Sequence, residues 1–267
     1  MNFTRVGAIV LRQFYLMRGS PARVFPLFAW IAIDIVLWGF ITRYLNSVAQ
    51  TGFDFVPALL GAVLLWNFLT RVMQGVTLAF FEDVWSRNFL NFFATPLRIS
   101  EYLTGLVATG IITSLLGLAV MLALAFAAFG LSFAAYGLAM APFLFVLFLS
   151  GIALGVFGSA LVLRLGPASE WLIWPIPTLV SPFAGVFYPI GVLPIWMQYV
   201  SKALPPSYVF EGMRAITAGQ PTPWAILGWG AALACAYVAL ACWTFSAVYR
   251  TAIRSGLIAR YSAESVA

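Results

Sequence analysis

The chain has almost no lysine. Lys202 is the only lysine in 267 residues, and it follows Ser201 rather than a glycine. The phosphate-binding loop that grips ATP needs a lysine directly after a glycine. The sequence therefore excludes such a loop, and any uphill work that the chain does must draw on another chain or on an ion gradient.

Charge of either sign is also scarce. Charged residues make up 8% of the chain and hydrophobic residues 63%, whereas a soluble domain has about 25% charged residues. So few charges could not keep the surface of a chain of this length in water. The composition excludes a soluble protein and predicts an integral membrane protein.

Metal-binding and redox side chains are nearly absent as well. The sequence has no histidine, and its two cysteines, Cys235 and Cys242, lie seven residues apart in an apolar stretch. On one helix they would stand about 10 Å apart along the axis, which is too far for a disulfide. We expect both to be small packing residues, and we expect no metal site.

Long apolar runs are what the sequence does contain. Because about 20 apolar residues cross the hydrocarbon core of a bilayer, we expect six transmembrane helices. No hydrophilic insertion between them could hold an enzyme domain, so residues 1–267 are expected to form a single transmembrane domain of the all-α class. The six stretches are Val24–Thr42, Pro57–Phe81, Leu103–Phe129, Tyr136–Leu163, Trp171–Ile190 and Trp224–Tyr249.

Residues 1–20 are expected to form an amphipathic helix in the headgroup layer, which Ser20 and Pro21 would end. A simple basic tail is the alternative. Three arginines lie between apolar residues that recur at helical spacing, namely Phe3, Val6, Val10, Phe14 and Met17.

The placement of the arginines predicts the orientation. Cytoplasmic loops carry an excess of positive charge, so the richer side is expected to be cytoplasmic, with both termini there. The poorer side has only Arg43, Lys202 and Arg214. The richer side has Arg5, Arg12, Arg18, Arg23, Arg87, Arg98, Arg164, Arg250, Arg254 and Arg260.

The loop of residues 82–97 is the sharpest local signal. Glu82 and Asp83 open it, apolar residues recur through its middle, and Pro96 ends it. This pattern predicts a short amphipathic helix along the cytoplasmic membrane surface. Its apolar side chains need a cover, which could be lipid or a groove in a partner protein.

Two charges fall inside the expected spans. Asp34 and Arg71 each lie about 16 Å from the cytoplasmic boundary of their helix, where an unpaired charge costs about 3 kcal/mol or more. We therefore expect them to approach each other or to face a polar interior. They could form a structural ion pair or belong to a substrate site.

Residues 191–217 are expected to form an external helical hairpin. Pro194 could begin one short helix, Pro205 and Pro206 would interrupt the chain, and Ser207 could cap a second helix. Glu211 and Arg214 are three residues apart on that helix and able to pair. Such a hairpin could dip into the outer leaflet as a gate, and a solvent-exposed loop is the alternative.

One stretch carries small residues at four-residue spacing, namely Gly151, Gly155 and Ser159. Small residues on one face let membrane helices approach closely. Helix packing is the favoured interpretation, and a pore lining is the alternative.

Taken in order, these features resemble the membrane subunit of the type-2 ABC exporters, the ABC-2 permeases. The resemblance covers nearly the full length, from the surface helix and the six spans to the acid-opened loop ending in Ala94–Leu97. Its best-matching blocks are Ser181–Pro189, Val192–Pro194, Leu204–Tyr208 and Glu211–Arg214.

The resemblance implies that two permease subunits, here a homodimer, surround a central path, and that two separate ATPase subunits dock below. The partner ATPases would bind ATP and Mg²⁺, so this chain would hold no cofactor and perform no chemistry. Residues 82–97 would be the coupling helix that inserts into the ATPase, through Glu82, Asp83, Trp85, Arg87, Asn88, Leu90 and Phe93.

The resemblance also implies a path and a gate. Spans one, two and five would line the path, with span five at its centre, and residues 191–217 would be an external re-entrant hairpin. The expected substrate-path residues are Trp171, Trp174, Phe183, Phe187 and Tyr188. The expected gate residues are Pro194, Trp196, Tyr208, Glu211 and Arg214.

The sequence therefore predicts the permease subunit of an ATP-driven exporter in a bacterial inner membrane. Amphipathic drugs, lipids and lipid-linked glycans are the candidate substrates. The alternative is a self-sufficient secondary transporter or channel that uses Asp34 and Arg71. The lack of an internal inverted repeat argues against that alternative. A membrane scaffold without transport activity is a third option.

Overall fold

The computed structural model describes residues 2–49, 55–85, 95–131 and 133–256. Within these ranges all regular structure is helical. The prediction of an all-α protein is therefore confirmed.

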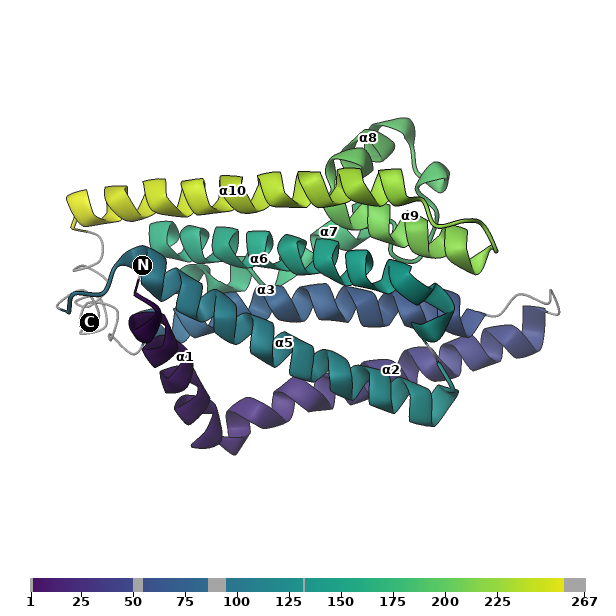
Figure 1. The fold of residues 1–267 in the computed structure, drawn as a ribbon, viewed down its shortest axis with the longest axis horizontal. Coiled ribbons are helices and arrows are strands. Elements are labelled where there is room, and N and C mark those ends of the chain that lie inside the picture. Colours follow the sequence, from purple (N-terminus) through teal and green to yellow (C-terminus); the bar gives the residue numbers. More distant parts are fainter. Residues whose placement is uncertain (1, 50–54, 86–94, 132, 257–267) are drawn as a thin grey trace.

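Five helices in the described ranges are long and apolar enough to cross a membrane, at 29–49, 56–84, 99–129, 136–165 and 224–254. They belong to α2 (Pro21–Ala49), α3 (Gly61–Trp85), α5 (Ile99–Phe129), α6 (Met140–Leu165) and α10 (Trp224–Arg254). A π-helical turn, η1 (Val56–Leu60), leads into α3, and η2 (Phe133–Ala139) leads into α6. α10 packs on α6, α6 on α3 and α3 on α5, while α2 crosses obliquely along α5 (Figure 1). The chain is a multi-pass membrane protein.

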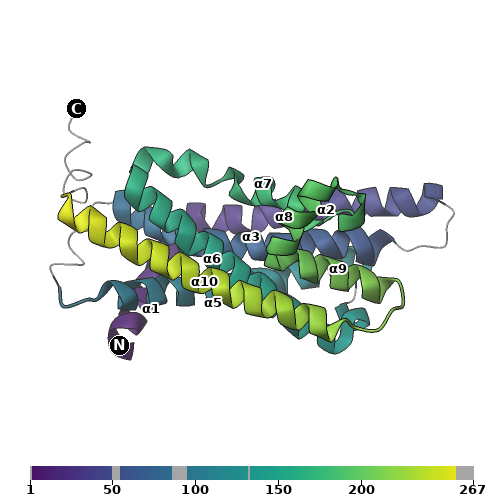
Figure 2. The same cartoon turned by 90° about the horizontal axis from the view of Figure 1, so that it is seen from above.

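The expected fifth span is not one helix. Trp171–Ile190 is divided among η3 (Pro167–Leu172), α7 (Pro175–Ala184) and the start of η4 (Ile190–Val192). Prolines break it, because a proline lacks the amide donor of a helix and restricts the residue before it. Gly185 ends α7 in the left-handed region at a φ of 63°. The segment nevertheless returns along the bundle from the end of α6 toward α8 (Figure 2), so a count of six unbroken spans is not confirmed.

Close contact between α3 and α6 forms the centre of the bundle. A Cβ built on Gly151 would lie 2.8 Å from the carbonyl oxygen of Leu69, and one on Gly155 would lie 2.9 Å from that of Met73. The Oγ of Ser159 donates within its own helix, to the carbonyl of Gly155 at 2.9 Å. These positions therefore let two helix backbones approach, as the packing interpretation of the small-residue stripe predicts.

α1 (Phe3–Arg18) lies across one end of the bundle, against α5 (Figure 1). The side chain of Asn2 caps it by accepting the backbone N–H of Thr4 at 3.0 Å. The chain turns at Gly19 and Ser20, and α2 begins at Pro21. The predicted helix and its end are confirmed.

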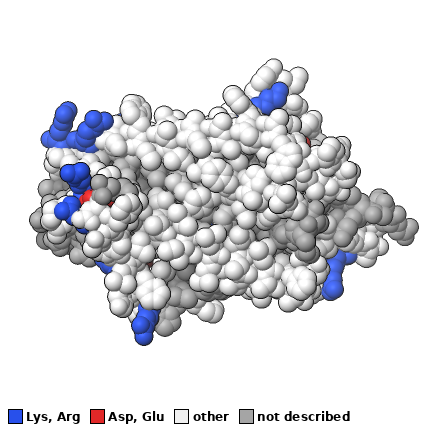
Figure 3. Space-filling view, viewed as in Figure 1, with Lys and Arg blue, Asp and Glu red and all other residues white. Residues whose placement is uncertain are grey.

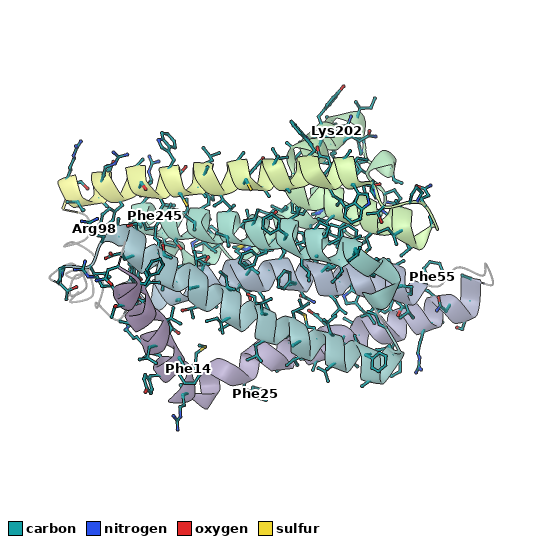
Figure 4. All side chains as sticks on the ribbon, in the orientation of Figure 1. Phe14, Phe25, Phe55, Arg98, Lys202 and Phe245 are labelled. Atoms are coloured by element: carbon teal, nitrogen blue, oxygen red, sulfur yellow. The ribbon has the colours of Figure 1, made fainter. Side chains whose placement is uncertain are left out.

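Charged side chains gather at the two ends of the molecule. On the face drawn in Figure 3, blue and red atoms lie toward the ends, and an uncharged belt separates them. Arg98 lies at the end that carries α1, whereas Lys202 and Phe55 lie toward the opposite end (Figure 4). The last turns of α6 and α10, with Arg164 and Arg254, are also at the α1 end.

The two cysteines do not pack in the core, contrary to expectation. Cys235 and Cys242 are both unpaired and exposed on α10. Their neighbours Ala234 and Ala241 are buried, because those positions form the face of α10 that packs on α6. The cysteines lie off that face and toward the surroundings of the bundle.

Candidate functional site

The predicted coupling segment, residues 82–97, begins differently from expectation. Glu82 and Asp83 belong to the last turns of α3, which continues to Trp85, so no separate helix starts at Glu82. Apolar residues keep the helical period of α3 across the expected boundary, and no proline or glycine interrupts it. Four of the predicted contact residues lie outside the described residues, namely Arg87, Asn88, Leu90 and Phe93.

Asp83, one of the predicted coupling residues, is buried and has its partners within this chain. One of its oxygens lies 2.6 Å from Nη2 of Arg12 on α1. Its other oxygen accepts a hydrogen bond from the hydroxyl of Tyr102 on α5 at 2.7 Å. The Asp83 side chain has 0% exposure, and Tyr102 is equally buried. A buried charge needs such partners, so this cluster joins α1, α3 and α5.

A second cluster lies at the start of α5. The carboxylate of Glu101 accepts the backbone N–H of Asn2 at 2.7 Å and that of Arg98 at 3.1 Å. Arg5 lies 3.3 Å from the same carboxylate, and it also donates to the backbone carbonyl of Pro96. α1 is thereby tied to the last residues of the predicted coupling segment.

These two clusters, which we call the collar, were not predicted. The collar consists of Arg12, Asp83 and Tyr102 together with Arg5 and Glu101. From the sequence, the arginines of α1 indicated only an amphipathic surface helix and the orientation of the chain. One pattern in the sequence could have indicated these contacts. Acids at positions 83 and 101 flank the loop on its two sides, and the N-terminal helix has arginines but no acids with which they could pair.

The expected pair of intramembrane charges does not form. Asp34 accepts a hydrogen bond from Nδ2 of Asn67 at 3.2 Å, and within the described residues no ion pair joins Asp34 to Arg71. Arg71 lies one helical turn beyond Asn67 and instead covers Gly117 of α5, where a built Cβ would lie 2.9 Å from its Cδ. The missing side chain at 117 gives Arg71 room to turn toward α5, away from Asp34.

The predicted path residues lie on the broken fifth segment. Trp171 and Trp174 are exposed. Phe187 stacks on Trp38 of α2, with ring centroids 5.0 Å apart and planes 7° apart. The hydroxyl of Tyr188 donates to the carbonyl of Pro182 at 2.9 Å. The structure therefore brings the segment against α2 at one aromatic contact.

Two helices occupy the predicted hairpin, α8 (Ile195–Ala203) and α9 (Pro205–Thr217). Pro194 is the N-cap of α8, and the hydroxyl of Tyr208 donates to the carbonyl of Lys202 at 2.5 Å. Ser207 does not cap α9, because Leu204 is the N-cap and Pro205 the first helical residue. The Ser207 hydroxyl instead bonds to the carbonyls of Ser201 and Leu204, which holds the two helices together.

The hairpin is tied to the end of α7. Arg214 and Glu211 pair at 2.7 Å, as their spacing predicts. The same Glu211 carboxylate accepts the backbone N–H of Ile190 at 2.9 Å, and Phe183 meets Trp196 edge to face at 6.2 Å. A Cβ on Gly185 would lie 3.3 Å from the Arg214 guanidinium. The left-handed turn after α7 therefore fits closely against α9.

An apolar cavity of about 290 Å³ adjoins the hairpin. It lies among α6, α7, α9 and α10, and Pro205 and Pro206 line one side of it. The proline break therefore faces a space inside the bundle rather than solvent alone.

Comparison with known families gives a direct result. The family model of the ABC-2 type transporter matches residues 4–217. The chain belongs to the ABC-2 type transporter family. The match begins in α1 and ends at the last residue of α9, so it covers the collar, the fifth segment and the hairpin. No curated protein matches the sequence.

Membership makes the chain a transmembrane subunit of an ABC transporter, and it implies an ABC ATPase partner. Members of this family are transport subunits rather than enzymes. The sequence of this chain has no ATP-binding lysine motif, as expected of a subunit that relies on a separate ATPase.

Proposed function

We propose that the chain is the permease subunit of an ATP-driven exporter, working as a homodimer with two copies of a separate ATPase. The α1 end of the bundle is cytoplasmic in this proposal, because most of the described arginines lie there. Both termini would then be cytoplasmic, and the hairpin of α8 and α9 would face outside. The membrane would be the bacterial inner membrane.

The collar is the observation that carries the coupling proposal. Asp83 lies in the last turns of α3, before the predicted coupling segment continues, and Glu101 lies in the first turn of α5 after it; arginines of α1 pair with both acids. An ATPase that moves this segment would therefore displace α1, α3 and α5 together. A buried charged pair resists separation, so the force reaches the bundle as a rigid-body movement.

The transport path in this proposal lies between the two permease subunits, along α2 and the fifth segment. Both carry large exposed aromatic side chains, including Trp30 and Tyr44 on α2 and Trp171 on η3. Their contact at Trp38 and Phe187 would make the two elements move together. Because Glu211 and Trp196 tie α7 to the hairpin, movement of the fifth segment would open the external gate.

Aromatic faces suit amphipathic drugs, lipids and lipid-linked glycans. These three classes are the proposed substrates. The apolar cavity beside the hairpin accords with cargo that has a hydrocarbon part.

The ATPase contact is tested by co-purification from membranes that express both subunits. Leu90→Asp should abolish recovery of the ATPase, because a charge on the apolar face of the coupling segment would have to be buried in the groove. Leu138→Asp is the matched control, since Leu138 is highly exposed at the opposite end of the bundle. Equal recovery of the ATPase with both variants would contradict the proposal.

The homodimer is tested by disulfide cross-linking in a chain whose two native cysteines are replaced by alanine. Leu179→Cys on α7 should give a cross-linked dimer in membranes. Leu240→Cys on α10 should remain monomeric, although both leucines are exposed to a similar degree. A dimer only with Leu240→Cys would place the interface on the other face.

A further inference from the structure

A cavity of about 110 Å³, lined by both apolar and polar side chains, lies between α1, α3 and α5, in the half of the bundle near α1. α1 and α3 each pack against α5 (Figure 1), and the cavity fills the space left between them. Its polar lining includes Gln13, Arg71, Gln74, Thr113 and Ser114. Because one water needs about 10–15 Å³, the space holds several waters or one phosphate-sized group.

Two hydrogen-bonding groups in this lining are buried without a partner. Gln13 is 4% exposed and Ser114 is 1% exposed. Among the described residues, neither Nε2 of Gln13 nor Oγ of Ser114 has a hydrogen-bond partner. Buried groups of this kind are normally satisfied by protein, ordered water or a ligand. Both groups are able to donate a hydrogen bond into the cavity.

Arg71 adds a charge to the same lining. A guanidinium stays protonated and offers five N–H donors, and within the described residues no carboxylate lies within ion-pairing distance of Arg71. Asp34, the nearest acid expected from the sequence, is bonded to Asn67 instead. The Arg71 part of the cavity therefore combines a positive charge with several donors.

Glu82 is the acidic residue of the lining. It lies eleven residues after Arg71 on α3, about 16 Å farther along the axis, toward the end of the helix. The carboxylate and the guanidinium therefore occupy different ends of the cavity.

We propose that this cavity binds a phosphate oxyanion, with Arg71 as its main ligand and Gln13 and Ser114 as further donors. A guanidinium binds phosphate through two parallel hydrogen bonds. A phospholipid headgroup and free inorganic phosphate share this chemistry. The probes in the test below distinguish these two sources.

The depth of Arg71 follows from its place in its span. The span that contains it, Val56–Val84, has 29 residues and is about 44 Å long, which exceeds a hydrocarbon thickness of about 30 Å. Arg71 is the sixteenth residue of this span, so it lies close to the middle of the span, and a bound headgroup would have to enter the bundle to reach it.

The test uses the purified full-length chain in a neutral detergent and measures ligand affinity by the shift of its thermal unfolding temperature. The probes are dioctanoyl phosphatidylglycerol, dioctanoylglycerol as the matched lipid without phosphate, and sodium phosphate at constant ionic strength. We expect the phosphatidylglycerol to bind more tightly than dioctanoylglycerol. Arg71→Gln should weaken this binding about tenfold or more, the usual effect of losing a charged hydrogen-bond partner.

The matched control is Arg254→Gln, which removes an exposed arginine from the last turn of α10 at the same end of the bundle. It should leave the affinity unchanged. Ser114→Ala removes a buried donor that has no partner, so the chain should keep its unfolding temperature without lipid and bind phosphatidylglycerol about threefold to tenfold more weakly. If Arg71→Gln does not fold, the affinity of Ser114→Ala for phosphatidylglycerol tests the proposal instead.

Each possible result either supports or overturns the proposed site. Binding of sodium phosphate with the same dependence on Arg71 would support the oxyanion site and identify free phosphate as the ligand. Equal binding of the two lipids would overturn the proposal. Equal effects of Arg71→Gln and Arg254→Gln, or no effect of Ser114→Ala on binding, would overturn it as well and leave a cavity filled by water.

Discussion

The ion pair between Arg12 and Asp83 predicts an unequal cost for removing its two partners. The side chain of Arg12 is 27% exposed, whereas that of Asp83 is 0% exposed. When Asp83→Asn removes the acid, the arginine left behind can reach water. When Arg12→Gln removes the base, the carboxylate left behind has no access to water.

The magnitude follows from this difference in burial. Breaking a buried pair from one side costs about 3–5 kcal/mol, because the buried charge loses its opposite charge. We therefore expect Arg12→Gln to lower the free energy of unfolding by about 3–5 kcal/mol. Asp83→Asn should cost less, about 2 kcal/mol, since the remaining arginine is partly hydrated and exposed pairs contribute about 0–1 kcal/mol.

The assay is reversible unfolding in mixed micelles, with helix content followed by circular dichroism. Glu211→Gln is the control, because the Glu211 side chain is 40% exposed and its partner Arg214 is 20% exposed. Its loss should cost about 1 kcal/mol. The reasoning would be refuted if Arg12→Gln cost no more than this control, or if Asp83→Asn proved the more damaging change of the collar pair.

Three further predictions concern packing, the path and the attachment of α1. Gly155→Ala should destabilise the chain by about 1–3 kcal/mol, because the new Cβ would lie 2.9 Å from a backbone carbonyl of α3. Gly191→Ala should be nearly neutral in the same unfolding assay, since no atom of the described residues lies within 4 Å of its Cβ position; equal costs would contradict the close packing. Trp38→Ala should reduce export of a fluorescent drug by about twofold to tenfold, which corresponds to the free energy of one stacked aromatic pair. Trp243→Ala, on the exposed face of α10, is the control and should leave export unchanged. Glu101→Gln should increase hydrogen–deuterium exchange of the backbone amides of α1, because it weakens the carboxylate that holds Asn2 and Arg5, and unchanged exchange would show that packing alone holds α1.

Features that depend on the local sequence could be predicted. The surface helix, the long apolar helices, the proline break between α8 and α9 and the pair of Glu211 and Arg214 all follow from spacing within about 30 residues. The prediction of the fifth span as a single helix was wrong, and the reason also lies in the local sequence. Its apolar composition was weighed above the prolines that divide it.

Contacts between distant helices could not be predicted in the same way. The approach of Asp83 to Arg12 depends on how α1 turns back against α5, and no local pattern specifies that angle. The pairing of Asp34 with Arg71 was wrong because depth along a helix says nothing about direction around it. Asn67 precedes Arg71 by one turn and meets the acid first, while Gly117 lets the arginine turn toward α5.

The most direct test of the account is native mass spectrometry of the detergent-purified complex, combined with its ATP hydrolysis. The account predicts two copies of this chain with two copies of a subunit that carries the glycine–lysine phosphate loop, and hydrolysis that depends on that subunit. Contradiction would come from liposomes that contain this chain alone. If they accumulated ethidium on an imposed proton gradient without any nucleotide, the chain would supply its own driving mechanism.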